Sequence, residues 1–298
     1  MNILIIGSKG FIGSHCLEYF SGSHTVFGCD IVKDEASPHY FPIAASSPGY
    51  APVFSAQQFD VCINCSGAAS VPDSLNDPYR DFELNTVNVF KILDAISRHQ
   101  PACKFLNLSS AAVYGNPESL PVNEEASLHP LSPYGWHKRY AEIICKEFFI
   151  TKKINTYSVR IFSAYGERLK KQLFWDLYQK TKNSKQVQLF GTGNESRDFI
   201  YILDLVKAIE LVMNNAPFDG GCLNIANGKE VTLRDAVTTF ISLLGNGITV
   251  NFNNESRSGD PLNWCAGIST LQAMGYQQQY SLQQGLKNYI EWLKQEKL

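Results

Sequence analysis

Short apolar runs alternate with helix-type patterns along the first half of the chain. The apolar runs are rich in β-branched residues, as is typical of buried strands. They lie at residues 2–6, 25–29, 61–65, 104–108 and 155–160. Patterns with helical spacing of apolar positions lie between them, near residues 11–21, 79–99 and 134–152. This alternation predicts an α/β fold with a doubly wound parallel sheet, in which ligands bind at the carboxyl ends of the strands.

The alternation becomes looser after about residue 162. Residues 31–60 contain several prolines and leave room for at most one weak strand. Further helical patterns and short strand patterns follow, the helices near 169–182, 203–214, 232–244 and 281–297 and the strands near 187–190, 222–225 and 248–252. We therefore expect a Rossmann domain over residues 1–162, to which 203–214 returns. A smaller α+β lobe that binds the substrate is expected over 163–298.

Composition narrows the class of protein. The 298 residues are 44% hydrophobic and 18% charged, and the formal net charge is −2. This charge gives no global reason to expect binding to nucleic acid or to an anionic membrane. No stretch approaches the roughly 20 apolar residues of a membrane span, and no basic region precedes the first apolar run, so a cytoplasmic protein is expected.

The eight cysteines form no disulfide framework and no metal-binding cluster. Cys62 and Cys65 have the spacing of a redox or zinc pair, but they fall in a predicted buried strand. Their side chains would therefore point to opposite faces of the sheet. We expect reduced, packed thiols and no metal.

A glycine-rich turn follows the first predicted strand. Gly7 permits the tight turn, Gly10 lets the backbone approach a pyrophosphate, and Gly13 lets the following helix pack closely. The amides at the start of that helix, beside Phe11 and Ile12, would hold the phosphates. The alternative is a turn without a ligand.

Asp30 ends the second predicted strand, immediately before Ile31. A carboxylate there can accept hydrogen bonds from both ribose hydroxyls of an adenosine and repels a 2′-phosphate, which favours NAD over NADP. The alternative is an acid that only ends a strand.

A tyrosine and a lysine one helical turn apart supply the candidate chemistry. Ser132 and Pro133 open a predicted helix, which places Tyr134 and Lys138 on one face. The ammonium group would lower the pKa of the phenol, which could then take a proton from a secondary alcohol. Ser110 lies past the strand at 104–108, and its hydroxyl could bind the same substrate oxygen.

Each of these residues also has a structural interpretation. A Tyr-Lys pair on a helix is often purely structural, and a serine at this position can simply cap a loop. His137, between Tyr134 and Lys138, is expected to face solvent.

Several motifs together resemble one family. They are the GxxGxxG turn at 7–13, SSAAVYG at 109–115, SPYGxxK at 132–138, VRIFSAYG at 159–166 and GTG…RDFIY at 191–201. The match continues through NIANG at 224–228 and RSGD at 257–260. The chain resembles the extended short-chain dehydrogenase/reductases, and among them the NAD-dependent nucleotide-sugar epimerase/dehydratase branch.

The resemblance assigns roles to particular residues. Ser110, Tyr134 and Lys138 would be catalytic, and Lys138 would also hold the nicotinamide ribose. Arg197 and Arg257 would grip the diphosphate of a sugar nucleotide, unless they form surface ion pairs. Further residues are implied in the cofactor site (Ser66, Gly67, Ala68, Asn85, Phe162) and in the substrate site (Ser163, Asp260, Trp264). The family also implies a homodimer through the helices at 79–99 and 134–152.

Departures from the family pattern reduce the number of reactions that the chain is expected to catalyse. Ala111 and Ala112 stand where the dehydratases of the family carry an Asp-Glu pair, so water elimination has no acid or base there. Ser163 replaces an asparagine of the epimerases. Trp264 occupies a position where bulk narrows the sugar pocket of the family's UDP-galactose 4-epimerases, which suggests an unacetylated sugar.

The leading hypothesis is an NAD-dependent nucleotide-sugar epimerase that inverts C4 of a UDP-hexose through a transient 4-keto sugar. The alternatives are an NAD(P)H-dependent reductase of a nucleotide-linked 4-keto sugar and a dinucleotide-binding sensor without turnover. The family resemblance further implies a role in supplying precursors for polysaccharide biosynthesis.

Overall fold

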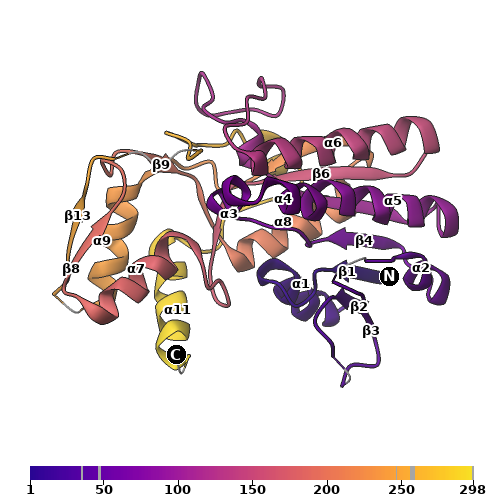
Figure 1. Cartoon of the computed structure of the whole chain (residues 1–298), viewed down its shortest axis with the longest axis horizontal. Coiled ribbons are helices and arrows are strands. Elements are labelled where there is room, and N and C mark those ends of the chain that lie inside the picture. The colour runs from indigo at the N-terminus through magenta and orange to yellow at the C-terminus, as the bar shows by residue number, and fades with distance from the viewer. Residues whose placement is uncertain (35, 46–47, 246, 256–258, 297–298) are drawn as a thin grey trace.

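A seven-stranded parallel sheet forms the centre of the computed structural model, which describes all residues except 35, 46–47, 246, 256–258 and 297–298 (Figure 1). In sheet order the strands are β11 (Asp219–Ile225), β6 (Thr156–Ile161), β5 (Lys104–Ser110), β4 (Val61–Asn64), β1 (Asn2–Ile6), β2 (Thr25–Asp30) and β3 (Tyr40–Pro42). All neighbouring strands run parallel. This confirms the doubly wound α/β fold.

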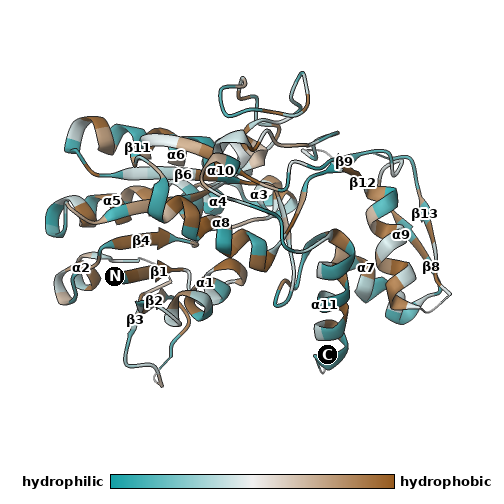
Figure 2. Ribbon diagram, turned by 180° about the vertical axis from the view of Figure 1, so that it is seen from behind, coloured by the Kyte–Doolittle hydropathy of each residue, from teal (hydrophilic) through white to brown (hydrophobic). Residues whose placement is uncertain are grey.

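Helices cover both faces of this sheet, because successive side chains of each strand point to opposite faces. On one face, Leu4 and Ile6 of β1 pack with α2 (Ala51–Ala56), α5 (Asn88–His99) and α6 (Pro133–Lys152). On the other, Ile3 and Ile5 belong to the core that includes α1 (Phe11–Ser21) and α8 (Ile202–Asn215). Figure 2 shows the hydrophobic strands enclosed between these helices.

Two features of this domain were not expected. The proline-rich stretch holds β3, as the weak strand allowed there, but also the short helix α2, which begins with Pro52 in its first turn. The strand expected in the lobe near 222–225 lies in the large sheet instead, where β11 pairs with β6. Its pairing with β6 covers the edge that β6 would otherwise expose.

Three short elements connect β4 to α5: α3 (Val71–Asn76), α4 (Pro78–Phe82) and the π-helix η1 (Glu83–Val87). The 3₁₀-helix η2 (Ala111–Val113) directly follows β5. The predicted helix at 79–99 is thus three consecutive segments, α4, η1 and α5.

A smaller lobe lies at one end of the sheet (Figure 1). Its helices are α7 (Gln172–Asn183), α9 (Leu233–Leu244) and α11 (Leu282–Gln295). The short helix α10 (Ser269–Ala273) lies instead beside the large sheet, against β11 and α8 (Figure 2). The short strands of the lobe pair as β8 (Gln186–Leu189) with β13 (Thr249–Phe252), β9 (Ser196–Arg197) with β12 (Val231–Thr232), and β7 (Ser163–Tyr165) with β10 (Phe199–Tyr201). The domain boundary near residue 162 stays a prediction. Among the described residues, no helix is long and apolar enough to cross a bilayer.

Candidate active site

The glycine-rich turn between β1 and α1 is shaped by close backbone contacts. Gly7 has a φ of +79°, and a Cβ atom there would lie 2.7 Å from the backbone nitrogen of Ser66. A Cβ atom on Gly13 would lie 2.1 Å from the carbonyl oxygen of Gly7. Gly10 caps α1 without a side-chain hydrogen bond, and the first turn carries no acidic residue. The first amides of the helix are therefore available to an anion, which fits the diphosphate of a dinucleotide.

Asp30 joins this turn to the end of β2. Its Oδ2 accepts a hydrogen bond from the backbone N–H of Lys9 at 2.9 Å, and its Oδ1 accepts one from Val32 at 3.2 Å. Each carboxylate oxygen retains capacity for a further donor, as ribose hydroxyls would require.

The loop after β4 forms the next wall of the same crevice. Ser66 donates from its Oγ to Asn64 at 2.5 Å, and Gly67 adopts a φ of +111°. Asn85, on η1, is 1% exposed and donates from its Nδ2 to Asp81 at 3.0 Å. Its Oδ1 is buried and has no partner among the described residues, and it lies 2.5 Å from where a Cβ of Gly67 would stand. A buried acceptor without a partner, aimed at this loop, fits a site that takes a ligand.

Tyr134, Lys138 and Ser110 come together where α6 begins above the end of β5. Ser132 caps the helix by accepting a hydrogen bond from Gly135 N–H at 3.2 Å. The amine of Lys138 lies 5.9 Å from the centre of the Tyr134 ring, and Ser110 hydrogen-bonds to the Tyr134 side chain. The structure thus brings the three predicted catalytic side chains into one cluster.

The acidity of Tyr134 differs from the expectation. Burial raises the pKa of Tyr134 to about 12, against the opposing effect of the hydrogen bond from Ser110. Burial also lowers the pKa of Lys138 to about 8. The Lys138 amine donates to the carbonyl of Leu108 at 2.9 Å. A positive charge brought into the crevice would lower the pKa of the phenol.

Residues predicted to bind substrate lie beside this cluster. Arg197 donates to the carbonyls of Ser196 and Leu262, and its guanidinium lies 5.5 Å from the ring centre of Trp264. Burial lowers the pKa of Arg197, and the carboxylate of Asp260 opposes this. The indole N–H of Trp264 donates to the carbonyl of Gly115 at 2.9 Å.

Of three further residues predicted in the site, the structure describes two. Phe162 is buried, with its ring 6.0 Å from that of Trp264 in an edge-on arrangement. Ser163 starts β7 and donates from its backbone N–H to the carbonyl of Asp198 at 3.0 Å. Arg257 lies outside the described residues.

A cavity of 20 Å³ adjoins the catalytic cluster, lined by Val71, Ala112, Gly115, Leu131, Ser132, Gly259, Pro261 and Trp264. This is room for about one water molecule.

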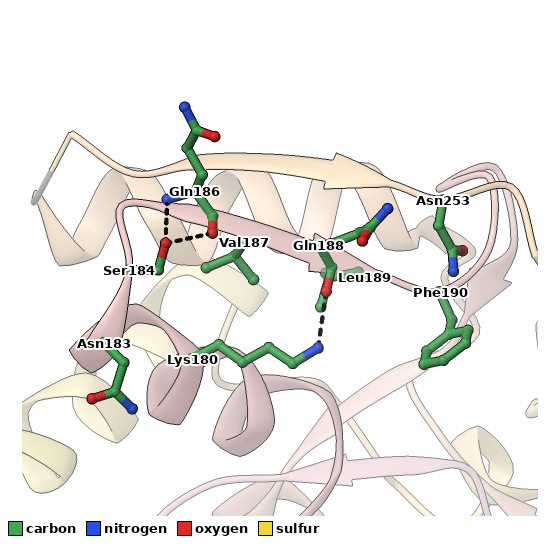
Figure 3. Close-up of a pocket in the computed structure, with 9 residues that line it drawn as sticks. All are labelled: Lys180, Asn183, Ser184, Gln186, Val187, Gln188, Leu189, Phe190 and Asn253. Atoms are coloured by element: carbon green, nitrogen blue, oxygen red, sulfur yellow. Dashed lines mark hydrogen bonds between the residues drawn. The ribbon is translucent and has the colours of Figure 1, made fainter.

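A larger, open pocket of 460 Å³ lies in the lobe, between the end of α7 and β8 (Figure 3). Six of its nine lining residues are polar, and the Lys180 amine already donates to the carbonyl of Gln188 at 2.9 Å. It shares no lining residue with the catalytic cluster.

The sequence analysis was wrong about His137. The residue is 9% exposed, and its Nδ1 lies 2.6 Å from Oδ2 of the buried Asp81. The cause is the packing of α6 against α4 and η1, which covers this side of the helix. The spacing gave a usable signal, since a residue three positions after Tyr134 shares its face of the helix.

A second buried group also escaped the sequence analysis. Arg160 on β6 binds both carboxylate oxygens of Glu142 on α6, at 3.0 and 2.8 Å, and donates to the hydroxyl of Tyr114 at 2.8 Å. Ser109 donates to the same carboxylate at 2.6 Å. This network fixes α6 against the strand end that carries Ser110.

Comparisons with known proteins agree with this geometry. The model of the NAD dependent epimerase/dehydratase family matches residues 3–226. A relative described as an uncharacterized UDP-glucose epimerase, YtcB of Bacillus subtilis, is 28% identical, with 98% of each chain covered. A putative UDP-glucose 4-epimerase of Methanocaldococcus jannaschii is 26% identical, again over 98% of each chain. Among solved structures, a variant of the UDP-glucuronic acid 4-epimerase of Bacillus cereus, in complex with UDP-4-deoxy-4-fluoro-glucuronic acid and NAD, matches with a TM-score of 0.89 and 25% identity over 99% of each chain.

Proposed function

This chain belongs to the NAD-dependent epimerase/dehydratase family, and from that premise we propose that it is an enzyme that inverts C4 of a UDP-hexose. The observation that carries the proposal is the cluster of Ser110, Tyr134 and Lys138 beside the crevice of the glycine-rich turn. The relatives described as UDP-glucose epimerases, which match over nearly their whole length, support the choice of substrate.

The residues of the chain divide the work of one proton transfer. When bound, NAD supplies a reversible hydride acceptor, so a sugar can be oxidised and reduced again without net change. The phenol oxygen of Tyr134 takes the proton of the C4 hydroxyl and returns it. Ser110 donates a hydrogen bond to the C4 oxygen of the sugar, and the ammonium of Lys138 favours the phenolate form of Tyr134.

Two features favour epimerisation over the other chemistry of the family. Ala111 and Ala112 are buried in η2 directly after Ser110, so no acid or base stands there to eliminate water. Asp30 disfavours the 2′-phosphate of NADPH, which argues against a biosynthetic reductase.

The test is incubation of the purified protein with UDP-glucose, UDP-galactose, their N-acetylated counterparts and UDP-glucuronic acid. We expect at least one of them to equilibrate with its 4-epimer, as followed by proton NMR of the anomeric signals. Removing the proton-transfer group in Tyr134→Phe should slow this by about 10²–10⁴-fold. If none of these sugars yields a 4-epimer, the proposal fails. Loss of nicotinamide absorbance with a 4-keto sugar would instead indicate the reductase, and NAD release without any turnover would indicate a sensor.

We also propose a homodimer through α5 and α6. Their outer surface carries several large apolar side chains that are exposed in the single chain: Phe90, Trp136, Tyr140, Ile143 and Ile150. Apolar groups gathered on adjacent helices of a soluble protein mark an interaction surface, and an isologous dimer buries the same surface twice. Sedimentation velocity measures this directly. The cytoplasmic location and the role in polysaccharide precursor supply stay predictions from the sequence.

A further inference from the structure

Asp81 lies at the centre of a buried polar group that the proposed reaction does not use. It is 3% exposed on α4, and its two oxygens have different partners. Oδ2 lies 2.6 Å from Nδ1 of His137 on the catalytic helix α6, and Oδ1 accepts the hydrogen bond from Nδ2 of Asn85 on η1. A second bond joins the same segments, from the Thr86 hydroxyl to the carbonyl of His137 at 3.0 Å.

The chemistry of these groups fixes their orientation. A carboxylate only accepts hydrogen bonds, so Nδ1 of His137 carries the proton and the amide nitrogen of Asn85 must face Asp81. The oxygen of Asn85 is thereby turned the other way, toward Gly67 and the cofactor crevice, where it has no partner among the described residues. The π-helical turn that presents Asn85 is a rare element that occurs frequently at functional sites.

We propose that Asp81 and His137 are positioning residues, which together hold the Asn85 amide toward the cofactor. The inference deepens the proposed function, since it concerns the same site. It gives the His137 side chain a role in the site that is separate from the proton transfer by Tyr134 and Lys138.

The charge of Lys138 depends on its surroundings. Burial lowers the pKa of Lys138 to about 8, and the Asp81 carboxylate is the largest influence that raises it. The titratable groups that face Lys138 come from several elements: Asp81 on α4, Cys65 after β4, Tyr134 and Glu142 on α6, and Lys171 before α7. Without Asp81, Lys138 would lose its proton at a lower pH.

The experiment measures the affinity of the wild-type protein and four variants for NAD between pH 6 and 10, by quenching of tryptophan fluorescence. Asp81→Asn removes the charge but can still bond to both neighbours if His137 changes tautomer. His137→Leu removes the donor, and His137→Asn restores a donor near the position of Nδ1. Thr156→Val is the matched control, because it removes a buried hydrogen bond from β6 to the Cys145 carbonyl, far along α6 from the crevice.

Each variant has a distinct expected result. In Asp81→Asn, the pH above which NAD affinity falls should be lower than in the wild type. His137→Leu should bind NAD about tenfold more weakly at all pH values, because a hydrogen bond to a charged group is lost. His137→Asn and Thr156→Val should bind as the wild type does.

A purely structural role gives another outcome. Asp81→Asn and His137→Leu would then lower the melting temperature, as Thr156→Val does, while the affinity of the folded protein for NAD and its pH midpoint stay at wild-type values. That result would overturn the inference. The assay needs no turnover, so a failure to epimerise any sugar would overturn the proposed function and leave this result standing.

Discussion

Asp198 places a carboxylate in the interior of the protein, and we expect its ionisation to change the free energy of unfolding with pH. Its side chain is 0% exposed, and no lysine or arginine of the described chain forms an ion pair with it. It accepts hydrogen bonds from the backbone N–H groups of Asn227 at 3.0 Å, Ala266 at 3.1 Å and Lys229 at 3.2 Å. One carboxylate thus holds together the loop after β11 and the segment that follows Trp264.

The size of this effect on the free energy of unfolding follows from the pKa of Asp198. Burial raises the pKa of Asp198 from the ordinary value of 3.8 to about 6, although the backbone hydrogen bonds oppose the rise. Between these two pH values the folded state binds a proton that the unfolded state has released. Binding this proton adds to the free energy of unfolding, and the added stability is present below pH 4 and lost as pH rises through 6. A difference of about two pH units corresponds to about 3 kcal/mol of unfolding free energy.

The assay is urea unfolding of the wild type and Asp198→Asn at several pH values between 4 and 7.5. Other groups titrate in both proteins, so the quantity of interest is the difference between them. Wild type should lose about 3 kcal/mol relative to Asp198→Asn across this range. Asp94→Asn, at a half-buried position on α5 where the carboxylate pairs with Arg98, controls for the loss of one negative charge. Parallel pH curves for wild type and Asp198→Asn, or a gain by wild type as pH rises, would refute the reasoning.

Two further predictions concern the cofactor crevice and the dimer. Gly13→Ala places a methyl group 2.1 Å from the carbonyl oxygen of Gly7, so the turn must open. NAD affinity measured by calorimetry should fall at least about tenfold, whereas Gly49→Ala, with open space around it, should bind NAD normally. Equal affinity in both variants would show that the turn does not hold the cofactor. Ile143→Glu, at a side chain 54% exposed on α6, should convert the dimer to monomers in sedimentation velocity, because it buries an unpaired charge in the interface. Leu203→Glu on α8, which lies on the other face of the sheet, should leave the assembly unchanged, and a dimer that persists in Ile143→Glu excludes this interface.

The sequence predicted those features that are encoded locally. Apolar runs such as Ile3–Ile6 are buried on both faces and could only be central strands of a parallel sheet. The cap at Ser132 and the spacing of Tyr134 and Lys138 likewise require no knowledge of distant residues. The glycine-rich turn can be recognised from the sequence because close backbone contacts leave no room for a side chain at Gly7 and Gly13.

The features that the sequence did not reveal depend on contacts between distant segments. His137 is buried by Asp81, 56 positions away, and Arg160 finds Glu142 across a strand-helix contact. The pKa of Tyr134 was predicted from one neighbour, but burial by the whole surrounding structure outweighs that neighbour. The place of β11 was missed because a short apolar strand carries no mark of the sheet that it will join.

The position of β11 also determines when the central sheet can be completed during synthesis. Its partner β6 ends at Ile161, but β11 ends only at Ile225, after most of the lobe's first part has been made. Until then, the outer edge of β6 presents unpaired N–H and C=O groups to the ribosome's surroundings, and such an edge can pair with another nascent chain. A chain that stops before Asp219 would therefore leave β6 as the unpaired edge of the sheet, which favours aggregation.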